Sequence, residues 1–306
     1  MTGDASPAVW RATGLAWSTG AAALEWSTPG DGAPKTSPLD LGAALAFTTG
    51  ADRRCTGLRR AGRRHACPTA APLPPASRSA QCPACQTTDR ADSIAADTRL
   101  HDPRPFAVYL AHHGSTVKVG ITAVERGQAR LLEQGALAST VISTGSLLAA
   151  RRVENLLGQA LGLPDRVSTS RKRAARAHPG TAAERATALL ATAESVKSLS
   201  WPEGQTRTDP QIADHTTTYG LPADGLRPDA AILPPTPGSV IAGRITCRIG
   251  ADLYLHTPAG LVLLDTRLLA GWSLTRAEPD SPLTAHLEAL TAPEAPHSPS
   301  NQACLF

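Results

Sequence analysis

The sequence predicts an α+β protein assembled from several small parts, and three observations carry this prediction. Near both ends of the chain, short alternations of apolar and polar residues are typical of antiparallel strands. Between residues 105 and 200, apolar residues recur at spacings of three and four, which is typical of helices. Between the N-terminal strands and this central region, four cysteines lie in a segment with few apolar residues.

These patterns divide the chain into six segments. They are a β-rich N-terminal segment, a zinc-binding segment, an α/β domain, a linker, a small β domain and a disordered tail, at residues 1–50, 51–100, 101–200, 201–237, 238–275 and 276–306. The linker is predicted from its content of Pro, Asp and Thr. The small β domain has the pattern of a barrel or meander, which the N-terminal strands could complete.

The α/β domain begins with two predicted strands, "FAVYLA" and "TVKVGIT", joined by a turn at residues 112–115. Three helices are expected to follow, at residues 125–136, 146–162 and 183–199. The middle helix has the clearest apolar stripe, and Gly162 is expected to end it.

The basic residues are distributed unevenly. Arginine outnumbers lysine by 26 to 4, which with abundant Ala and Pro indicates first a high-GC coding bias. The net charge of +4 does not establish a polyanionic partner. Two basic clusters nevertheless favour a phosphate-binding surface over a merely solvated face as the hypothesis to test. They contain Arg53, Arg54, Arg59, Arg60, Arg63 and Arg64, and then Arg166, Arg171, Lys172, Arg173 and Arg176.

The N-terminal sequence "MTGDASPAVW" has neither a basic stretch nor an apolar run, so no signal peptide is predicted. No apolar run approaches the roughly 20 residues that a membrane-spanning helix requires. We therefore expect a cytoplasmic protein. In a reducing compartment, clustered cysteines indicate a metal site before a disulfide.

Cys55, Cys67, Cys82 and Cys85 have the spacing C-x11-C-x14-C-x2-C. Two thiolates separated by two residues can face one ion, and four complete the tetrahedral shell of a structural zinc. We therefore predict a structural zinc site, with His65 as an alternative to one thiolate. A redox pair at "CPAC" and four unligated thiols are the other interpretations, although the redox pair lacks its usual βαβ context.

A zinc ion at these cysteines would also fix the shape of the arginine-rich stretch between the first two of them. Contacts of this stretch with nucleic-acid phosphates are plausible, whereas base-specific readout is not indicated. The predicted contacts are Arg59, Arg60, Arg63 and Arg64.

The α/β domain carries "VYLA" at 108–111, "VKVGIT" at 117–122, arginines on the next helix and Glu154 on the helix after that. Together these features resemble the GIY-YIG nuclease family, whose fold is a small antiparallel sheet with flanking helices. The resemblance implies that Tyr109 orients or deprotonates a water and that Glu154 holds Mg²⁺ or Mn²⁺. It also implies that Arg130 faces the phosphate, where a cation offsets the developing charge.

The chain departs from this pattern at three positions. Lys118 replaces the second tyrosine, and Gln134 stands where a histidine often follows the helical arginine. The interval from Gly120 to Arg130 is about two residues longer than usual, so Arg126 is a rival for the same role and a further predicted phosphate contact. Lys118 could still act on a phosphate as a point charge, and Gly120 would allow the substrate to approach the backbone.

A second resemblance covers the whole chain. The order of "RRCTG", "CPAC", "VKVGIT", "EQGA", "ARRVE" and a final "LF" resembles an uncharacterised bacterial zinc-containing family of unknown function with a GIY-YIG-like domain. That family brings no established activity.

The terminal "QACLF" is similar to the Gln-x-x-Leu-Phe peptide by which bacterial replication and repair proteins bind the sliding clamp. In such a peptide, Leu305 and Phe306 would be apolar anchors and Gln302 would fix the register, on a flexible tether. A tail end that folds back onto the protein is the alternative.

Three functional hypotheses follow. The favoured one is a nucleic-acid-associated protein, with DNA favoured over RNA, that processes DNA through a nuclease-like phosphate site and is recruited through its C-terminal tail. The second is a binding module on the same scaffold without turnover, which Lys118 and Gln134 favour. The third is an interaction protein with no role on nucleic acid, recruited by the sliding clamp.

Overall fold

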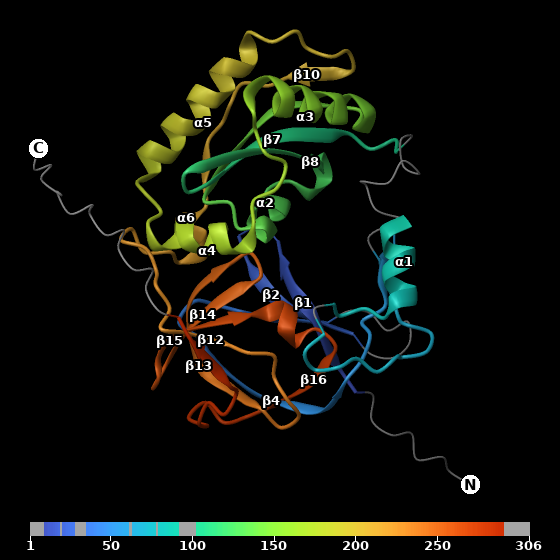
Figure 1. Ribbon diagram of the computed structural model, residues 1–306, viewed down its shortest axis with the longest axis vertical. Helices are drawn as coiled ribbons and strands as arrows, with labels where there is room; N and C mark the ends of the chain where they lie inside the picture. Colours follow the sequence, from blue (N-terminus) through green and yellow to red (C-terminus); the bar gives the residue numbers. More distant parts are fainter. Residues whose placement is uncertain are drawn as a thin grey trace, which may run out of the picture.

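The computed structural model describes residues 9–18, 20–27, 35–60, 63–77, 79–91 and 102–290, apart from the side chains of residues 59, 60, 63 and 91. Two sheet-based units lie along the long axis of the molecule, with the zinc-binding segment at their side (Figure 1). The lower unit in this view is a ten-stranded sheet, and the upper unit is a five-stranded sheet with helices. The protein is therefore α+β, as the sequence predicts.

The ten-stranded sheet combines strands from both ends of the described chain. β4 (Ala44–Arg53) pairs antiparallel with β13 (Val240–Ile249) on one side and β16 (Trp272–Arg276) on the other. β16 also pairs with β1 (Arg11–Trp17). The other members are β2 (Ala22–Ser27), β3 (Lys35–Pro38), β12 (Ala230–Ile232), β14 (Asp252–Thr257), β15 (Gly260–Asp265) and β17 (Leu287–Ala289). The N-terminal and C-terminal strands thus complete one another in one sheet.

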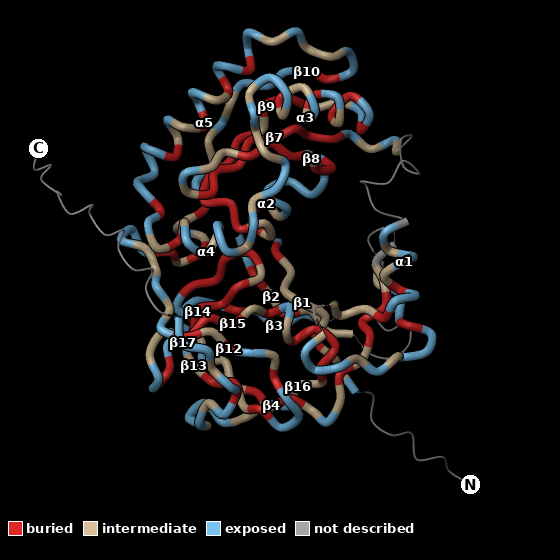
Figure 2. The backbone as a smooth tube through the Cα atoms, viewed as in Figure 1, coloured by how far each residue is buried: buried red, intermediate tan, exposed pale blue. Residues whose placement is uncertain are grey.

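Both halves of this sheet contribute to one apolar core. Ala12 and Leu24 from the N-terminal strands belong to the same buried cluster as Ile241, Leu255 and Val262 from the C-terminal strands. Alternate residues of a strand face the same side, so the alternation in the sequence supplies one apolar inner face. Figure 2 shows buried residues along these strands and, separately, along the strands of the upper unit.

The five-stranded sheet has the order β10–β9–β7–β8, with β11 pairing to β9. Its strands are β7 (Phe106–His113), β8 (Thr116–Ala123), β9 (Ala138–Gly145), β10 (Gln205–Arg207) and β11 (Ala213–Asp214). α3 (Leu147–Leu161) and α5 (Ala182–Lys197) supply one apolar layer, in which Val108 and Leu110 cluster with Val153 and Leu189. This face of the sheet is an ordinary hydrophobic core.

The opposite face is covered by α2 (Ala129–Gln134) and approached by α4 (Thr169–Ala177). Tyr109 and Ala111 of β7 pack with Leu131 beside α2. Gly114 in the β7–β8 turn has a φ of 73° and lies so close to α4 that an added Cβ would be 2.5 Å from the Cβ of Ala175. Glycine is required there by both the backbone conformation and the close approach.

The two units share a buried contact. Leu132 and Leu137 of the α/β unit cluster with Trp17, Cys247 and Tyr254 of the ten-stranded sheet. Within the ten-stranded unit, the indole N–H of Trp17 donates to the carbonyl of Gly250 at 2.8 Å, which fixes the ring that meets the α/β unit. The shared buried contact fixes α2 against the larger sheet.

The structure differs from the sequence prediction in several elements. The helix expected at 125–136 is a 3₁₀ turn at Val124–Arg126 followed by the short α2, because Gly127, with a φ of 45°, interrupts it. The predicted linker at 201–237 contains paired strands and the helix α6 (Thr216–Tyr219). In the predicted tail, β17 pairs with β12, so the described residues up to 290 include sheet structure. No helix in the described part of the chain has the length and apolar character to span a membrane.

Candidate functional site

The four predicted zinc ligands form one buried cluster. All four Sγ atoms lie within 4.8 Å of one another, and those of Cys67 and Cys82 are 3.9 Å apart. Four sulfurs bound tetrahedrally at about 2.3 Å from a zinc ion are about 3.8 Å apart, so the cluster fits this metal. The arrangement suggests a structural zinc. His65 is exposed and outside the cluster, so it does not replace a thiolate in this arrangement.

Local backbone structure brings the cysteines together. Cys55 and Cys67 flank the hairpin of β5 (Leu58–Arg60) and β6 (Arg63–His65). Cys82 precedes α1 (Pro83–Ala91), whose first residue is a proline, as is favourable at a helix start. The backbone N–H of Cys82 donates to Sγ of Cys55 at 3.1 Å; burial raises the pKa of the Cys55 thiol, and this hydrogen bond opposes the shift.

Gly57 is essential to the shape of this hairpin. It has a φ of 72°, and an added Cβ would lie 1.9 Å from the carbonyl oxygen of His65. No other residue fits without displacing the strand that leads to the second cysteine.

The arginine cluster around these cysteines is partly structural. Arg53 is buried and donates to the carbonyls of Ala270 at 2.9 Å and Ser77 at 2.8 Å, which fixes the zinc-binding segment to the larger sheet. Arg54 pairs with Asp52 at 2.5 Å. These two side chains are therefore engaged within the fold.

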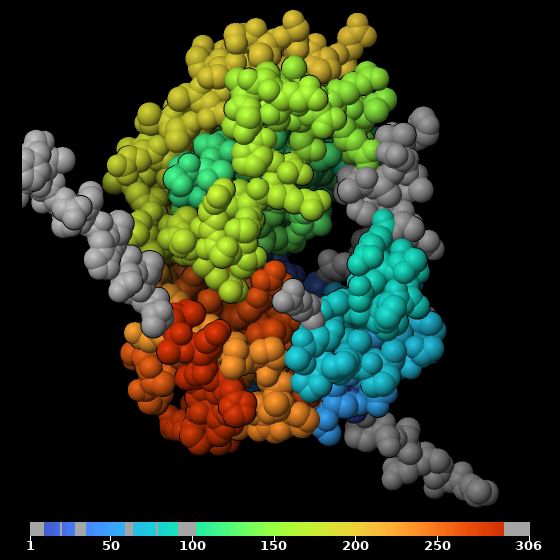
Figure 3. Space-filling model, in the orientation of Figure 1, coloured from blue at the N-terminus to red at the C-terminus, as the bar shows by residue number. Residues whose placement is uncertain are grey.

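The four arginines predicted to contact phosphate lie on the β5–β6 hairpin, with Arg59 opposite Arg64 and Arg60 opposite Arg63. Arg64 is half-buried, lies 3.6 Å from Glu25 and donates to a backbone carbonyl. The side chains of the other three are outside the described structure. In the space-filling view, the surface is hollowed between this segment (cyan) and the α/β unit (green) (Figure 3).

Tyr109 and Lys118 lie on neighbouring strands and on the same face of the five-stranded sheet. Tyr109 is opposite Gly120 and Ala111 is opposite Lys118, so the tyrosine and the lysine are diagonal neighbours. A Cβ at Gly120 would lie 2.5 Å from the tyrosine hydroxyl. The space left by this glycine therefore accommodates Tyr109, whereas the sequence suggested that it serves substrate approach.

Tyr109 is almost completely buried, with 1 % of its surface exposed. Its hydroxyl accepts a hydrogen bond of 2.7 Å from the side-chain amide of Gln134. Burial raises the pKa of Tyr109, and the hydrogen bond from Gln134 opposes that shift. The phenol is consequently neutral near pH 7 and already has a partner.

Lys118 is also buried, and its Nζ donates to the backbone carbonyl of Asp165 at 2.9 Å. The same Nζ is 5.6 Å from the centre of the Tyr109 ring. Burial lowers the pKa of Lys118, and the charge of Glu154 opposes that shift. The position at which the sequence departs from the nuclease-like pattern is thus occupied by a buried lysine that is hydrogen-bonded within the fold.

Glu154, on α3, is the carboxylate of this region. Burial raises its pKa, the charge of Lys118 lowers it, and that of Asp165 raises it further. Arg130, on α2, acts electrostatically on both Tyr109 and Lys118. The four predicted catalytic residues come from β7, β8, α2 and α3, and each interacts with at least one of the others.

Arg126, the rival arginine, lies in the 3₁₀ turn before α2. It forms an ion pair of 2.5 Å with Glu133, and Arg130 is 3.6 Å from the same carboxylate. Both arginines remain exposed enough to meet a ligand, with about two-fifths of each side chain accessible, at 41 % and 45 %.

Lys172, on α4, is a member of this region that sequence reasoning placed only in a basic cluster. Its Nζ donates to the backbone carbonyl of Gln134 at 2.8 Å. Burial and the nearby charges of Lys118, Arg176 and Arg130 lower the pKa of Lys172 to about 8. No sequence pattern could reveal this position, because its partner is a carbonyl group 38 residues away.

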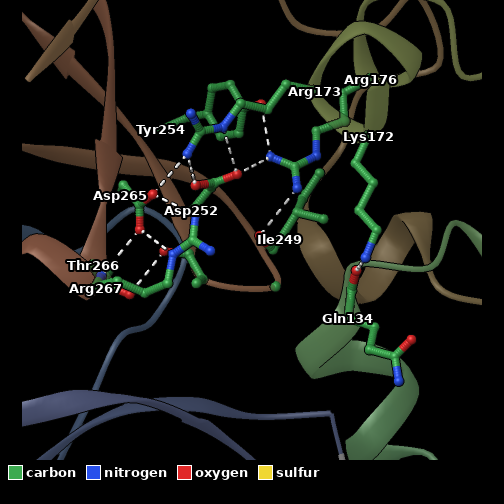
Figure 4. Close-up of polar contacts among 12 residues, drawn as sticks. Gln134, Lys172, Arg173, Arg176, Ile249, Asp252, Tyr254, Asp265, Thr266 and Arg267 are labelled. Atoms are coloured by element: carbon green, nitrogen blue, oxygen red, sulfur yellow. Dashed lines mark hydrogen bonds and ion pairs between the residues drawn. The ribbon is translucent and has the colours of Figure 1, made fainter. Parts of the chain in front are cut away.

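α4 is positioned by an ion-pair network with the ten-stranded sheet (Figure 4). Asp252 accepts from Arg173 and from Arg176, each at 2.5 Å, and Asp265 accepts from Arg173 at 3.0 Å. Burial alone would raise the pKa of Asp252, but the hydrogen bond from Arg173 and the charge of Arg176 lower it below its usual value. The network explains why the second basic cluster is buried on one side.

A family model described as "Protein of unknown function (DUF2797)" matches residues 42–274. The chain belongs to this family. The DUF2797 match runs from the loop before β4 to the middle of β16 and so includes the cysteine cluster and the whole five-stranded sheet. No curated protein and no solved structure matches the chain. The predicted clamp-binding residues Gln302, Leu305 and Phe306 lie outside the described residues.

Proposed function

We propose that this DUF2797 protein associates with nucleic acid, DNA in preference to RNA, and that the region around Lys118 is a phosphate site. The observation that supports this proposal is the electrostatic grouping of Tyr109, Lys118, Arg130 and Glu154 from four separate elements. A buried ammonium group is unfavourable unless it has an anionic partner, and in the described structure no carboxylate lies within ion-pair distance of Lys118, although Glu154 acts on it at longer range. A phosphate of the nucleic-acid backbone is such a partner.

If the protein processes DNA, the side chains grouped around Lys118 would have different roles. Lys118 and Arg130 would stabilise the charge that develops on a phosphate during hydrolysis. Glu154 would bind Mg²⁺ or Mn²⁺, and a divalent ion at this place would lower the pKa of a bound water. The half-buried carboxylate of Glu154 and the neighbouring Asp165 are oxygen donors of the kind that these ions prefer.

A second candidate function is binding without turnover, and the surroundings of Tyr109 favour it. Its hydroxyl is buried and hydrogen-bonded to Gln134, so it cannot reach a water without rearrangement. In this form the same cations would hold the backbone of nucleic acid, and the arginine-rich hairpin would extend the contact.

Recruitment by the sliding clamp through Gln302, Leu305 and Phe306 is a separate part of the proposal, supported by their resemblance to a clamp-binding peptide. Capture of the full-length protein by purified clamp, and its loss when residues 302–306 are deleted, would establish it. Equal capture of both forms would refute it.

A cleavage screen tests the enzymatic form. The zinc-loaded protein is incubated with single-stranded, duplex and branched DNA and with RNA, in Mg²⁺ or in Mn²⁺. Glu154→Ala should abolish any cleavage, whereas Glu194→Ala, at an exposed position on α5, should not change it. Intact substrates under every condition would rule out the enzymatic form.

Both candidate functions require binding to nucleic acid, and the dependence of that binding on salt concentration tests them together. Fluorescence anisotropy at several salt concentrations should give a steep dependence of affinity on salt. Neutralising Arg59, Arg60, Arg63 and Arg64 together should make that dependence shallower by about one unit of slope per lost contact. Absence of binding to DNA and RNA at low salt would reject both candidates.

A further inference from the structure

Two lysines in the candidate phosphate site have hydrogen-bonding capacity to spare. The ammonium groups of Lys118 and Lys172 each have three N–H donors, yet each donates to a backbone carbonyl, of Asp165 and Gln134 respectively. Within the described part of the chain, neither lysine has a carboxylate at ion-pair distance. The two charges also repel one another, since Lys118 contributes to the lowered pKa of Lys172.

The neighbouring arginines on the same helix are in the opposite situation. Arg173 and Arg176 are neutralised by Asp252 and Asp265, and Figure 4 shows Lys172 extending away from this network toward Gln134. Of these three cations, Lys172 is therefore the one without a carboxylate partner in the described structure, and it extends toward α2.

His113 adds a third polar group on the same sheet face. It follows Tyr109 and Ala111 at alternate positions of β7, and 1 % of its surface is exposed. Neither ring nitrogen has a partner with regular hydrogen-bond geometry in the described structure, although the backbone of Gly135 is near enough to interact with the ring. Burial and the charges of Lys172 and Lys118 lower the pKa of His113 to about 3, although the backbone of Gly135 opposes this shift, so the ring is neutral and offers one N–H donor.

We propose that Lys118, Lys172 and His113 form the inner end of the phosphate site and receive the terminal phosphate of a nucleic-acid strand in preference to an internal phosphodiester. This inference rests on the proposed association with nucleic acid. Two chemical differences favour the strand end. A terminal monoester carries close to two negative charges near neutral pH, whereas a diester carries one. It also leaves three oxygens free of carbon, which matches three donor groups, whereas a diester leaves two.

The experiment compares the full-length zinc-loaded protein on matched oligonucleotides. Fluorescence anisotropy is measured on the same single-stranded sequence with a 5′-phosphate, with a 3′-phosphate and with hydroxyl groups at both ends. One of the phosphorylated forms should bind about tenfold tighter than the hydroxyl form. Lys172→Gln should reduce this preference to less than about twofold, since it removes a charge-assisted hydrogen bond.

Lys197→Gln is the matched control, because it removes one positive charge from an exposed position on α5 and should leave the preference unchanged. Thermal unfolding of each variant confirms that it is folded. If Lys172→Gln does not fold, Lys118→Gln provides the same test of the preference. A mononucleotide with a 5′-phosphate serves as competitor and should bind far more weakly than the phosphorylated strand.

The outcomes separate this inference from the proposed function. Equal affinity for phosphorylated and hydroxyl ends would overturn the inference and leave the association with nucleic acid intact. A preference that survives both lysine substitutions, or a mononucleotide that binds as tightly as the strand, would also overturn it. Absence of binding to every oligonucleotide at low salt would remove the proposed function and the inference together.

Discussion

The two sides of α4 carry similar charges in different surroundings. On one side, Arg173 and Arg176 contact carboxylates of the ten-stranded sheet, and on the other Lys172 donates to a carbonyl and has no carboxylate partner in the part of the chain that the structure describes (Figure 4). The arginine side completes its charge balance within the protein and joins the two units. On the other side, the charge of Lys172 is not balanced by a carboxylate among the described residues. In this respect Lys172 resembles the four clustered cysteines, because a metal ion from outside the chain would balance the negative charge of their thiolates. The difference separates cations that the fold neutralises from a cation that it leaves without a carboxylate partner among the described residues.

The largest effect on stability is expected at the four clustered cysteines, because the metal ion that would balance their charge comes from outside the chain. Cys82→Ser, or removal of zinc by a chelator, should unfold the segment from 55 to 85, since binding of a structural zinc contributes on the order of 10 kcal/mol to folding. Metal analysis should give one zinc per chain for the unaltered protein, and limited proteolysis should then cut this segment selectively. The network at Asp252 should remain intact. Unchanged proteolysis after complete metal removal would contradict a structural role for zinc.

Asp252→Asn tests the arginine side of α4. It leaves Arg176 buried beside a neutral amide, so the free energy of unfolding should fall by about 3–5 kcal/mol. Urea denaturation measures this change. Asp265→Asn is the matched control, and it should cost less because Asp265 is more exposed, 18 % against 3 %. A loss below about 1 kcal/mol at Asp252 would mean that the network does not hold the units together.

The pH dependence of stability sharpens the contrast between the two sides. The pKa of Lys172 is lowered to about 8 in the folded protein, below its usual value of 10.5. Between these values the unfolded chain binds the extra proton, so Lys172 contributes a stability that increases as pH rises from 8 to 10.5. The pKa of Asp252 is lowered from 3.8, so its contribution is present above pH 3.8 and is lost as the pH falls through the folded value. Urea denaturation at stepped pH should show the alkaline increase, and Lys172→Met should reduce it, leaving the part that the lowered pKa of Lys118 contributes.

The smallest effect is expected from Lys172→Met at pH 7. Replacing a repelled, half-buried ammonium group by an apolar side chain should leave the free energy of unfolding unchanged or raise it by up to about 1 kcal/mol. Binding of nucleic acid should nevertheless weaken. A clear loss of stability would show that this lysine serves the fold, as Arg176 does, and the distinction between the two sides would disappear.

Part of this organisation was predictable from the sequence. The spacing of apolar residues predicted α3 and α5, and the cysteine spacing predicted the cluster, because both signals are local. α4 was not predicted, since its sequence "TSRKRAARA" has no apolar stripe and it is held by carboxylates about 80 residues away. β11 and β12 escaped prediction because strands of two and three residues exist only through their distant partners.

The candidate site shows the same limit. Tyr109, Lys118, Arg130 and Glu154 could be named because each occupies a place in a family pattern. The sequence named Lys172 only as one member of a basic cluster and did not name His113, since what distinguishes them is what they lack: the lysine has no carboxylate, and the histidine no partner with regular hydrogen-bond geometry, among the described residues. Such an absence becomes visible only when every neighbour has been placed.

The pairing of β4 with β16 has a consequence for synthesis on the ribosome. Arg53 lies opposite Trp272 in this ladder, so the edge of β4 that pairs with β16 stays unpaired until about 220 more residues have emerged. At bacterial or eukaryotic elongation speeds this interval lasts on the order of 10–40 s. The five-stranded unit, whose hairpin and helices are close in sequence, can fold during that time, while the waiting strands are open to aggregation or to capture by chaperones.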